Sequence, residues 1–521
     1  MNVKNFQQNR KKAHKFERSY TMLLKKIVAS ALAVCMLLSI SACSGGKDPE
    51  SSGTDINDNS TVSTTTSSTN GDGSLDVGTT TLGTDGTSTS NADGTSTGGG
   101  RATRSSKSTN KTASTTKNPN VTVTTKNQTE LKNYYQRDEI KGTTIKILLW
   151  YAPDKDEKKE FDDFETMTGA KVKVIQTSYD NYQTKIASSI AARDPLDSVH
   201  MSADWYPAFV IRGLMQPIDN YIDKNDEVLD FTSMDLLKWG GKYYGVAGKD
   251  DASCMMVYFN KTMFDNTLGV KNPLQLYNEG NWNWNTFADL AKKMTVVSGG
   301  KTTRHGFAAY SYMGFMLSAG GSFFQIKNGK DITVSIKTSN AVAGWKFYKD
   351  LYSDGYAGDS GSNCISNFVS GKTAMLAHYS WIIKDRYTAP DTYSFASMND
   401  EWDWVPFPSY PDGKSYQPVE LSVWGIAKGS KNPLGAYLLN HWRAEGRGAT
   451  SGSQLPNEEI QRLQKMYALP KGVDFGKSVM GSDLWSLCWD MYDPDGDIDS
   501  AVDEWLPKMK SAAERLMKEA K

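Results

Sequence analysis

The segment DPDGDIDSAVDE, close to the C-terminus, carries acidic residues at a spacing that resembles a calcium loop. Asp493, Asp495 and Asp497 fit the first, third and fifth positions of an EF-hand, and Glu504 fits the twelfth. An EF-hand needs glycine at its sixth position for a sharp turn, but Ile498 stands there. Two interpretations stay open: a calcium site at these residues or, favoured by this departure, an acidic turn with a helix cap.

A second reactive residue type, cysteine, follows a short apolar run near the N-terminus. Two lysines precede the apolar residues 27–38, and small residues lead to Cys43. This order is typical of a secretory signal, and the run is too short for a membrane-spanning helix, which needs about 20 apolar residues. Ile40-Ser41-Ala42-Cys43 resembles the lipobox of bacterial lipoproteins, which implies cleavage before Cys43 and acyl chains such as palmitate on it. An ordinary signal peptide with a chance cysteine is the alternative.

The chain behind this cysteine has the composition of a tether. From Ser44 to Glu130 it has no aromatic residue, and serine, threonine and glycine dominate. Such a chain cannot bury enough apolar surface to offset its ordering entropy. We predict a signal peptide over 1–42 and a lipidated, disordered tether over 43–140, on the outer face of the cell membrane of a Gram-positive bacterium. A low-complexity ligand for another protein is the alternative. Met22 is an alternative start.

The remaining composition limits the class of protein. All 14 tryptophans lie at or beyond Trp150, so a folded part over 141–521 is expected, which is long enough for two domains. Without residues 1–42, 51 basic residues face 58 acidic ones, a balance that argues against nucleic acid as a partner. The three cysteines beyond Cys43 are widely spaced, which favours buried free thiols over disulfides or a zinc site.

The start of the folded part alternates between strand and helix patterns. Apolar β-formers fill 144–150, and aromatic residues at helical spacing follow over 156–168, where Gly169 ends the helix. A second strand is expected over 171–175 and a second helix over 182–192. This order predicts an α/β fold with a mainly parallel sheet, in which ligands bind beyond the carboxyl ends of the strands.

Nine later segments give the chain a family resemblance. Together with the start of the folded part, they resemble extracellular solute-binding proteins (family 1, carbohydrate type) of ABC importers, such as the maltodextrin-binding proteins, over nearly everything from Thr144 onward. The segments follow one another in family order: SADWYPAFVIRGLMQPIDNYI, GKYYGVAG, VYFNKTMFDNTLG, NWNWNTFADLAKKMT, SAGGSFF, GWKFYKDLYSDG, FVSGKTAMLAHYSW, DWVPFPSYPDGKSY and VWGIAKGSKNPLGAYLLNHW.

The resemblance implies a two-lobe, type II periplasmic-binding-protein-like fold, each lobe a mainly parallel sheet flanked by helices. Lobe 1 would take 141–249 and 404–430, and lobe 2 would take 250–403 and 431–521. The ligand would lie in the cleft between the lobes, and hinge closure would trap it.

A sugar offers an apolar ring face and an edge of hydroxyl groups, so it needs flat aromatic side chains and polar groups around them. By resemblance, Trp381 matches the main sugar-stacking tryptophan and Asp204 the ligand carboxylate, with Trp205 and Tyr206 as platforms. Tyr312 resembles a further stacking residue. The alternative for each aromatic residue is core packing, and for Asp204 it is helix capping.

Further candidates have weaker support. Asp154 and Lys155 resemble an Asp-Lys pair of the maltodextrin binders, although a solvated turn is the alternative. Asp251 lies where the chain is expected to cross between lobes, although a turn with two adjacent carboxylates is the alternative. The other candidates are residues that follow the first strand, flank a returning strand or lie in the C-terminal helices: Trp150, Glu420, Trp424 and Trp485.

Two tryptophans are expected to pack rather than bind. Trp282 and Trp284 precede a predicted helix for which Asn285 is a natural N-cap.

The resemblance implies a monomeric, lipid-anchored binding protein that hands an oligosaccharide to an ABC permease, without catalysis or a cofactor. The chain contains no G-x-S-x-G, H-E-x-x-H or Walker motif. A cell-surface glycoside hydrolase, with two carboxylates in an aromatic cleft, is one alternative. A sugar receptor for a sensor protein is another.

Overall fold

The computed structural model describes residues 128–248, 252–358, 361, 363–383, 393–446, 456–493 and 496–520. All of them lie in one compact unit, Thr115–Lys521. The predictions for the signal peptide, for Cys43 and for most of the tether lie outside the described residues. Among the helices of the described part, none is both long and apolar enough to cross a membrane.

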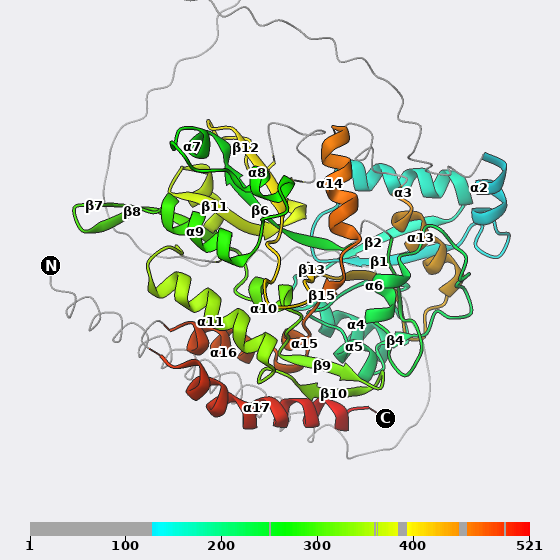
Figure 1. The fold of residues 1–521 in the computed structure, drawn as a ribbon. Helices are drawn as coiled ribbons and strands as arrows, with labels where there is room; N and C mark the ends of the chain where they lie inside the picture. Colours follow the sequence, from blue (N-terminus) through cyan, green and yellow to red (C-terminus); the bar gives the residue numbers. More distant parts are fainter. Residues whose placement is uncertain are drawn as a thin grey trace, which may run out of the picture. The chain divides into compact units, whose positions relative to one another are not determined.

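The first of two large sheets contains the strands at the start of the fold (Figure 1). β1 pairs in parallel with β2 and β3, as the alternating pattern predicted. β14 then pairs antiparallel with β3, and β4 and β5 pair antiparallel with β14. The strands are β1 (Thr144–Leu149), β2 (Lys171–Gln176), β3 (Ser198–Ser202), β4 (Met215–Gln216), β5 (Gly245–Val246) and β14 (Ser422–Ala427).

The helix between β1 and β2 illustrates how local sequence sets these elements. α3 (Lys155–Thr168) buries Phe161 and Phe164, which are spaced to share one helix face. The carboxylate of Asp154 accepts a hydrogen bond from the Glu157 amide and so caps the start of α3. Gly169 ends it with φ of 74°, a left-handed conformation that favours glycine.

The second large sheet has the strand order β15-β13-β6-β11-β8-β7, with β12 also paired to β6. β11 pairs in parallel with β8, but β6 pairs antiparallel with β11, β12 and β13. The expectation of a mainly parallel sheet in each lobe is therefore wrong for both sheets, because β14 runs antiparallel to three partners in the first sheet and β6 runs antiparallel to three partners in the second. The strands are β6 (Ser253–Asn260), β7 (Val296–Ser298), β8 (Lys301–Ala309), β11 (Thr373–Tyr379), β12 (Trp402–Pro406), β13 (Gln417–Glu420) and β15 (Lys471–Gly472).

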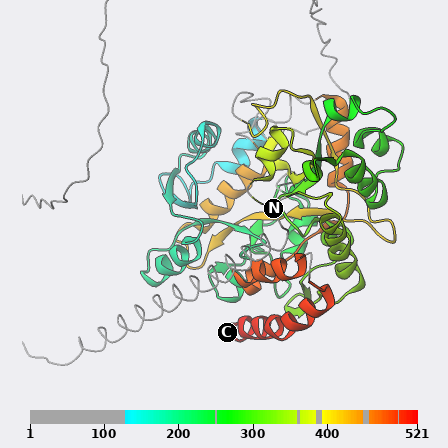
Figure 2. The ribbon, with the colours of Figure 1, turned by 90° about the vertical axis from the view of Figure 1, so that its left-hand side faces the viewer.

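Helices and a small hairpin complete the fold. The first sheet lies in one apolar core, and the second sheet contributes alternate residues to that core and to a second one: Met256 and Tyr258 of β6 to the first, Met255 and Val257 to the other. The hairpin is β9 (Phe324–Lys327) with β10 (Asp331–Val334). Figures 1 and 2 show α16 and α17 together, and α17 packs against β10 of the hairpin. The remaining helices are α2 (Gln128–Tyr135), α4 (Tyr182–Ala191), α5 (Ala208–Ile211), α6 (Phe231–Leu236), α7 (Lys261–Asp265), α8 (Pro273–Asn278), α9 (Trp284–Met294), α10 (Gly314–Ser318), α11 (Ser339–Ser353), α12 (Cys364–Val369), α13 (Pro433–Ala444), α14 (Asn457–Tyr467), α15 (Gly476–Met480), α16 (Asp483–Tyr492) and α17 (Ile498–Lys518).

Several expected boundaries shift. The folded part begins at α2 rather than at 141, because Leu131 and Tyr135 are buried in the core of the first sheet. β12 pairs with β6 of the second sheet, so the chain returns to the first sheet only at β14. α13 packs on β14, β1 and β3 of the first sheet instead of the second.

The packing role expected of Trp282 and Trp284 is confirmed, since both are buried. The expected N-cap is wrong by two residues: the side chain of Asn283, not Asn285, accepts hydrogen bonds from the first amides of α9. Cys254, Cys364 and Cys488 are buried thiols, as predicted.

Candidate functional site

Three loops at the carboxyl ends of β1, β2 and β3 bring aromatic and acidic side chains together. Trp150 directly follows β1, Tyr179 follows β2, and Asp204 and Trp205 follow β3. The Tyr179 hydroxyl donates a hydrogen bond of 2.6 Å to Oδ2 of Asp204. Because parallel strands end at the same sheet edge, these side chains share one surface.

Trp205 is held in a fixed orientation by its neighbours. Its ring stacks on Tyr182 at 4.6 Å and on Phe209 at 5.6 Å, with interplanar angles of 9° and 8°. Trp150 meets it edge-on at 5.3 Å. Trp205 remains partly accessible, so it offers a rigid aromatic surface beside the Asp204 carboxylate.

Glu420, a residue of the second sheet, lies close to Asp204 and Trp205. It is the last residue of β13, and only Leu421 separates it from β14 of the first sheet. The Leu421 carbonyl accepts a hydrogen bond of 3.0 Å from the amide of Ala203, the residue before Asp204. Burial raises the pKa of Glu420 from 4.5 to about 7, and the nearby Asp204 carboxylate adds to the shift. The two acids therefore lie where the chain passes from one sheet to the other.

The second sheet contributes an aromatic surface built in the same way. β8 and β11 are parallel neighbours, so Tyr310 after β8 lies beside Trp381 after β11. Their ring centroids are 6.2 Å apart and perpendicular, and both contact the buried His378 ring, at 4.3 and 4.9 Å. Tyr310 is 41% exposed and Trp381 46% exposed, which leaves both ring surfaces accessible.

The carboxylates of Asp204 and Glu420 act electrostatically on tyrosines of both surfaces. Burial raises the pKa of Tyr310, and the carboxylates of Glu420 and Asp204 raise it further. The pKa of the buried Tyr379 is raised by the same causes in the same order. For Tyr179, burial again comes first, followed by Asp204 and Glu420. The two acids are thus flanked by tyrosines from both sheets.

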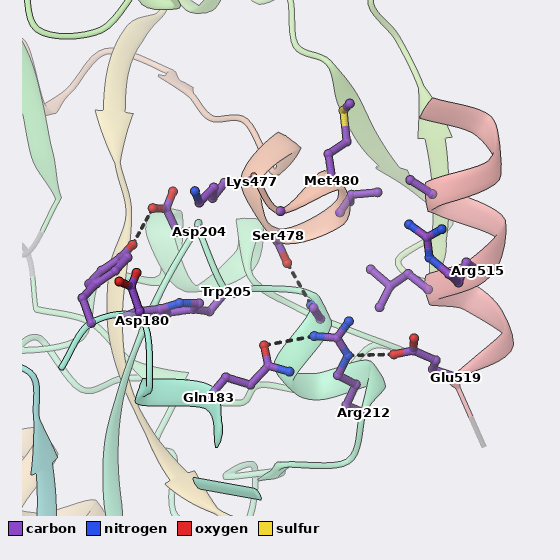
Figure 3. A pocket seen from close by; sticks show the side chains of 16 residues that line it. Asp180, Gln183, Asp204, Trp205, Arg212, Lys477, Ser478, Met480, Arg515 and Glu519 are labelled. Carbon is purple, nitrogen blue, oxygen red and sulfur yellow. Dashed lines mark hydrogen bonds and ion pairs between the residues drawn. The ribbon is translucent and has the colours of Figure 1, made fainter. Parts of the chain in front are cut away.

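A cavity of about 380 Å³ adjoins Asp204 and Trp205. It lies between α4 and α5 on one side and α15 and α17 on the other. Figure 3 shows Asp204 and Lys477 at one end and Arg515 with Glu519 at the other. Across it, Arg212 forms a 2.7 Å ion pair with Glu519, and the Ala208 amide donates to the Ser478 hydroxyl at 3.0 Å. The cavity is mostly polar and is bordered by Asp204 of the acidic pair but not by Glu420.

Some predicted residues lie beneath this surface rather than on it. Trp424 is 8% exposed, sandwiched between His200 at 4.9 Å and the Arg443 guanidinium at 4.2 Å. Tyr206 is buried, and its hydroxyl donates to the Lys238 carbonyl. Tyr312 is buried among Tyr348, Tyr492 and Trp489. These side chains support the site from below.

Asp154 and Lys155 lie at the start of α3, where both are exposed and Asp154 serves as the helix cap. Trp485 is 42% exposed on α16, with the Lys477 amine 5.2 Å from its ring centroid. Asp251 lies outside the described residues.

In the acidic C-terminal segment, Asp497 is the N-cap of α17. Its carboxylate accepts a hydrogen bond of 2.8 Å from the Ser500 amide. Glu504 pairs with Lys508 at 3.0 Å. Asp493 ends α16 as its C-cap, and Asp495 is not described. Among the residues that the structure describes, no group of three or more His, Cys, Asp or Glu side chains could hold a metal ion.

Three exposed aromatic residues of this region were missed: Tyr179, Tyr310 and Trp489, which are 38%, 41% and 49% exposed. Tyr310 directly follows an apolar strand, a position that could have identified it. Tyr312, two residues later, was selected instead, and strand alternation alone does not indicate which tyrosine is exposed.

The sequence and the fold of this chain are similar to those of known bacterial binding proteins. A family model described as bacterial extracellular solute-binding protein matches residues 159–447. A cyclo/maltodextrin-binding protein complexed with maltotetraose aligns with a TM-score of 0.56 and 19% identity, covering 72% of this chain and 98% of its own. The sugar-binding protein MalE of Xanthomonas citri aligns at 0.56 and 15% identity, covering 71% and 98%. An ABC substrate-binding protein of Listeria monocytogenes in complex with cycloalternan aligns at 0.52 and 18%, covering 72% and 98%. These likenesses establish a mixed α/β fold of the periplasmic-binding-protein type.

Proposed function

This chain belongs to the bacterial extracellular solute-binding proteins, and from that premise we propose that it captures an oligosaccharide and delivers it to the permease of an ABC importer. The structural neighbours whose names specify a sugar ligand favour a carbohydrate over other solutes. In this proposal the protein binds its ligand and releases it unchanged.

One observation carries the proposal: two carboxylates lie between accessible aromatic rings from both sheets. Trp381 and Tyr310 offer ring faces on one side, and Trp205 and Tyr179 offer them on the other. Asp204 and Glu420 lie between them, close enough to shift the pKa values of the tyrosines. Flat aromatic faces with carboxylates at their edge match the apolar face and hydroxyl rim of a sugar.

The passage of the chain between the sheets supports capture by closure. A single residue, Leu421, joins β13 to β14, so in this proposal the chain bends there when the two sheets close on the ligand. We place Cys43 in this scheme as the lipid anchor of a monomer on the outer face of a Gram-positive membrane. The tether behind Cys43 then gives the binding part reach toward its permease.

A glycan panel tests the proposal most economically. Thermal unfolding of the pure protein is followed with malto- and cello-oligosaccharides, and the sugars are then analysed by chromatography. A ligand that binds only the folded state raises the unfolding temperature. The proposal predicts such a rise for at least one series, with the sugar recovered intact. No rise with any glycan would contradict it.

The pair Asp204 and Glu420 also favours a second candidate, a glycoside hydrolase. Such enzymes use two carboxyl groups, one of them with a raised pKa that lets it act as a general acid. Glu420 meets that requirement with a pKa of about 7. The chromatographic step separates the candidates, because a hydrolase releases shorter sugars over time and a binding protein does not.

A further inference from the structure

The β7–β8 hairpin, residues 296–304, projects from the end of the second sheet (Figure 1). Its turn is formed by Gly299 and Gly300, which have φ of 57° and 72°. β7 is the last strand of its sheet, and it exposes Val297 at 63% and Val296 at 38%. Exposed valines are unusual there, because an unpaired strand edge is normally protected by charged side chains.

Positive charge surrounds these two valines. Lys292, Lys293 and Lys301 are exposed, and Arg304 lies in β8 on the same hairpin. None of the four cations forms an ion pair within the part of the chain that the structure describes. Residues 290–330 contain no acidic residue, although acidic residues outnumber basic ones over the chain from residue 43 onward. The hairpin is therefore a local cationic surface with apolar side chains near its tip.

The hairpin lies at the opposite end of β8 from the proposed sugar site. β8 begins at Lys301, next to the hairpin turn, and ends directly before Tyr310. Its nine residues place the two ends roughly 30 Å apart. A partner on the hairpin therefore leaves the aromatic surface of Tyr310 and Trp381 accessible.

Apolar side chains among unpaired cations fit the interface of an anionic lipid bilayer. Each basic residue near lipid phosphates strengthens binding about fivefold, and apolar side chains enter the boundary below the headgroups. A stable protein interface buries about 1,000 Å² or more, and an edge strand of three residues offers little of that area. The proposed acyl anchor at Cys43 holds the folded part near a bilayer, so even a weak contact acts at a high effective concentration.

We propose that the β7–β8 hairpin is a second membrane contact, whose valines enter the interface of an anionic bilayer and whose cations bind the lipid phosphates. The contact orients the anchored protein with the hairpin toward the lipid, and it is too weak to retain the protein without the anchor. The inference goes beyond ligand capture: it rests on the proposed anchor at Cys43 and is independent of the ligand.

Vesicle binding tests this contact. The chain from residue 43 onward, with Cys43→Ala so that no acyl chain contributes, is mixed with vesicles of equimolar phosphatidylglycerol and phosphatidylcholine. Replacing three lysines together, by Lys292→Gln, Lys293→Gln and Lys301→Gln, should weaken binding roughly 100-fold at low salt. Val297→Ala should weaken it roughly fivefold, because fewer apolar groups enter the interface.

A matched control removes the same charge elsewhere. Lys508→Gln, Lys510→Gln and Lys518→Gln together act on exposed lysines of α17 and should change vesicle affinity less than about twofold, since salt screens charges far from the lipid. Hydrogen exchange locates the contact, because anionic vesicles should slow amide exchange over residues 296–304 and leave α17 unchanged. Circular dichroism of each variant establishes that the fold is retained.

The outcomes that would overturn the inference are separate from those that concern sugar. Equal vesicle affinity for the hairpin variants and the unmodified chain refutes the contact, as does unchanged exchange over residues 296–304. Equal binding to pure phosphatidylcholine vesicles refutes recognition of anionic lipid. Protection of the hairpin by soluble inorganic polyphosphate, without vesicle binding, refutes a bilayer as the partner. A failure to bind any glycan contradicts the carbohydrate proposal alone and leaves this contact standing.

Discussion

The Tyr179 hydroxyl donates a 2.6 Å hydrogen bond to Oδ2 of Asp204 and thereby joins the loop after β2 to the loop after β3. The bond orients the Asp204 carboxylate, which keeps its other oxygen for a further partner. Trp205, stacked on Tyr182 at 4.6 Å, lies directly beside it. This pairing of a fixed acid with a fixed ring is the unit from which the proposed sugar site is built.

Replacing Trp381 removes the largest accessible ring of the second surface. Trp381→Ala is expected to weaken oligosaccharide binding at least tenfold, because the sugar loses its stacking face. Calorimetry measures the affinity, and circular dichroism checks the fold. Val297→Ala, which trims a side chain 63% exposed on β7, is the matched control and should leave affinity unchanged. Equal affinities for Trp381→Ala and the unmodified protein would remove Trp381 from the site.

Glu420 should make stability depend on pH near neutrality. The unfolded chain holds a proton at this carboxyl only below about pH 4.5, whereas the folded chain holds it up to about 7. The folded state therefore binds more protons within this window, and stability falls as the pH rises through it. Glu420→Gln removes the effect, so the variant should gain stability over the unmodified protein between pH 5 and pH 8, by at most about 3 kcal/mol.

Urea unfolding at both pH values measures this gain. The control is Glu504→Gln, at an exposed residue paired with Lys508. Its free energy of unfolding should differ from that of the unmodified protein by the same amount at both pH values. If the free energy of unfolding of Glu420→Gln also differs from that of the unmodified protein by the same amount at both pH values, Glu420 does not retain a proton in the folded state.

A buried hydrogen-bond network fixes the first helix to the rest of the fold. The Tyr135 hydroxyl lies 2.7 Å from Nδ1 of His441 and donates to Glu445 at 2.6 Å, and Nε2 of His441 lies 2.8 Å from Asp226. Tyr135→Phe should lower the free energy of unfolding by roughly 1–3 kcal/mol, because buried polar groups lose a partner.

The neighbouring Gln136 provides the control for that experiment. Its exposed side chain donates to the Met167 carbonyl on the surface, so Gln136→Ala should cost less than about 0.5 kcal/mol. If Tyr135→Phe costs no more than Gln136→Ala in denaturant unfolding, the network does not stabilise the fold.

The lipid anchor can be tested in cells. Cys43→Ala should release the protein into the medium, because the acyl chains that hold it at the membrane need the cysteine. Cys35→Ala, within the apolar run, leaves Cys43 in place and should remain with the membrane fraction. A Cys43→Ala protein still bound tightly to membranes would argue against lipidation there.

Local patterns predicted the start of the fold well. The run TIKILL became β1, and α3 ends at Gly169 as expected, because apolar spacing and a left-handed glycine act within a few residues. The cap of α9 was placed on Asn285 instead of Asn283, since neighbouring asparagines are chemically equivalent until the backbone conformation decides between them.

Long-range pairing was harder to predict. Nothing local to Trp402–Pro406 indicates that it pairs with β6, which lies far earlier in the sequence, and both sheets proved more antiparallel than expected. The same limit applies to the site. One region of the fold brings together four of the predicted residues, Asp204, Trp205, Glu420 and Trp381. Whether a tyrosine such as Tyr312 faces a ligand depends, however, on packing by helices that are distant in the sequence.

Calorimetric titration of the full chain with the oligosaccharide series tests the central claim most directly. The account predicts a saturable signal that ends at one ligand per protein, with no heat beyond saturation. Continuous heat release at constant sugar concentration would reveal turnover and contradict it. The absence of any binding signal across both series would contradict it equally.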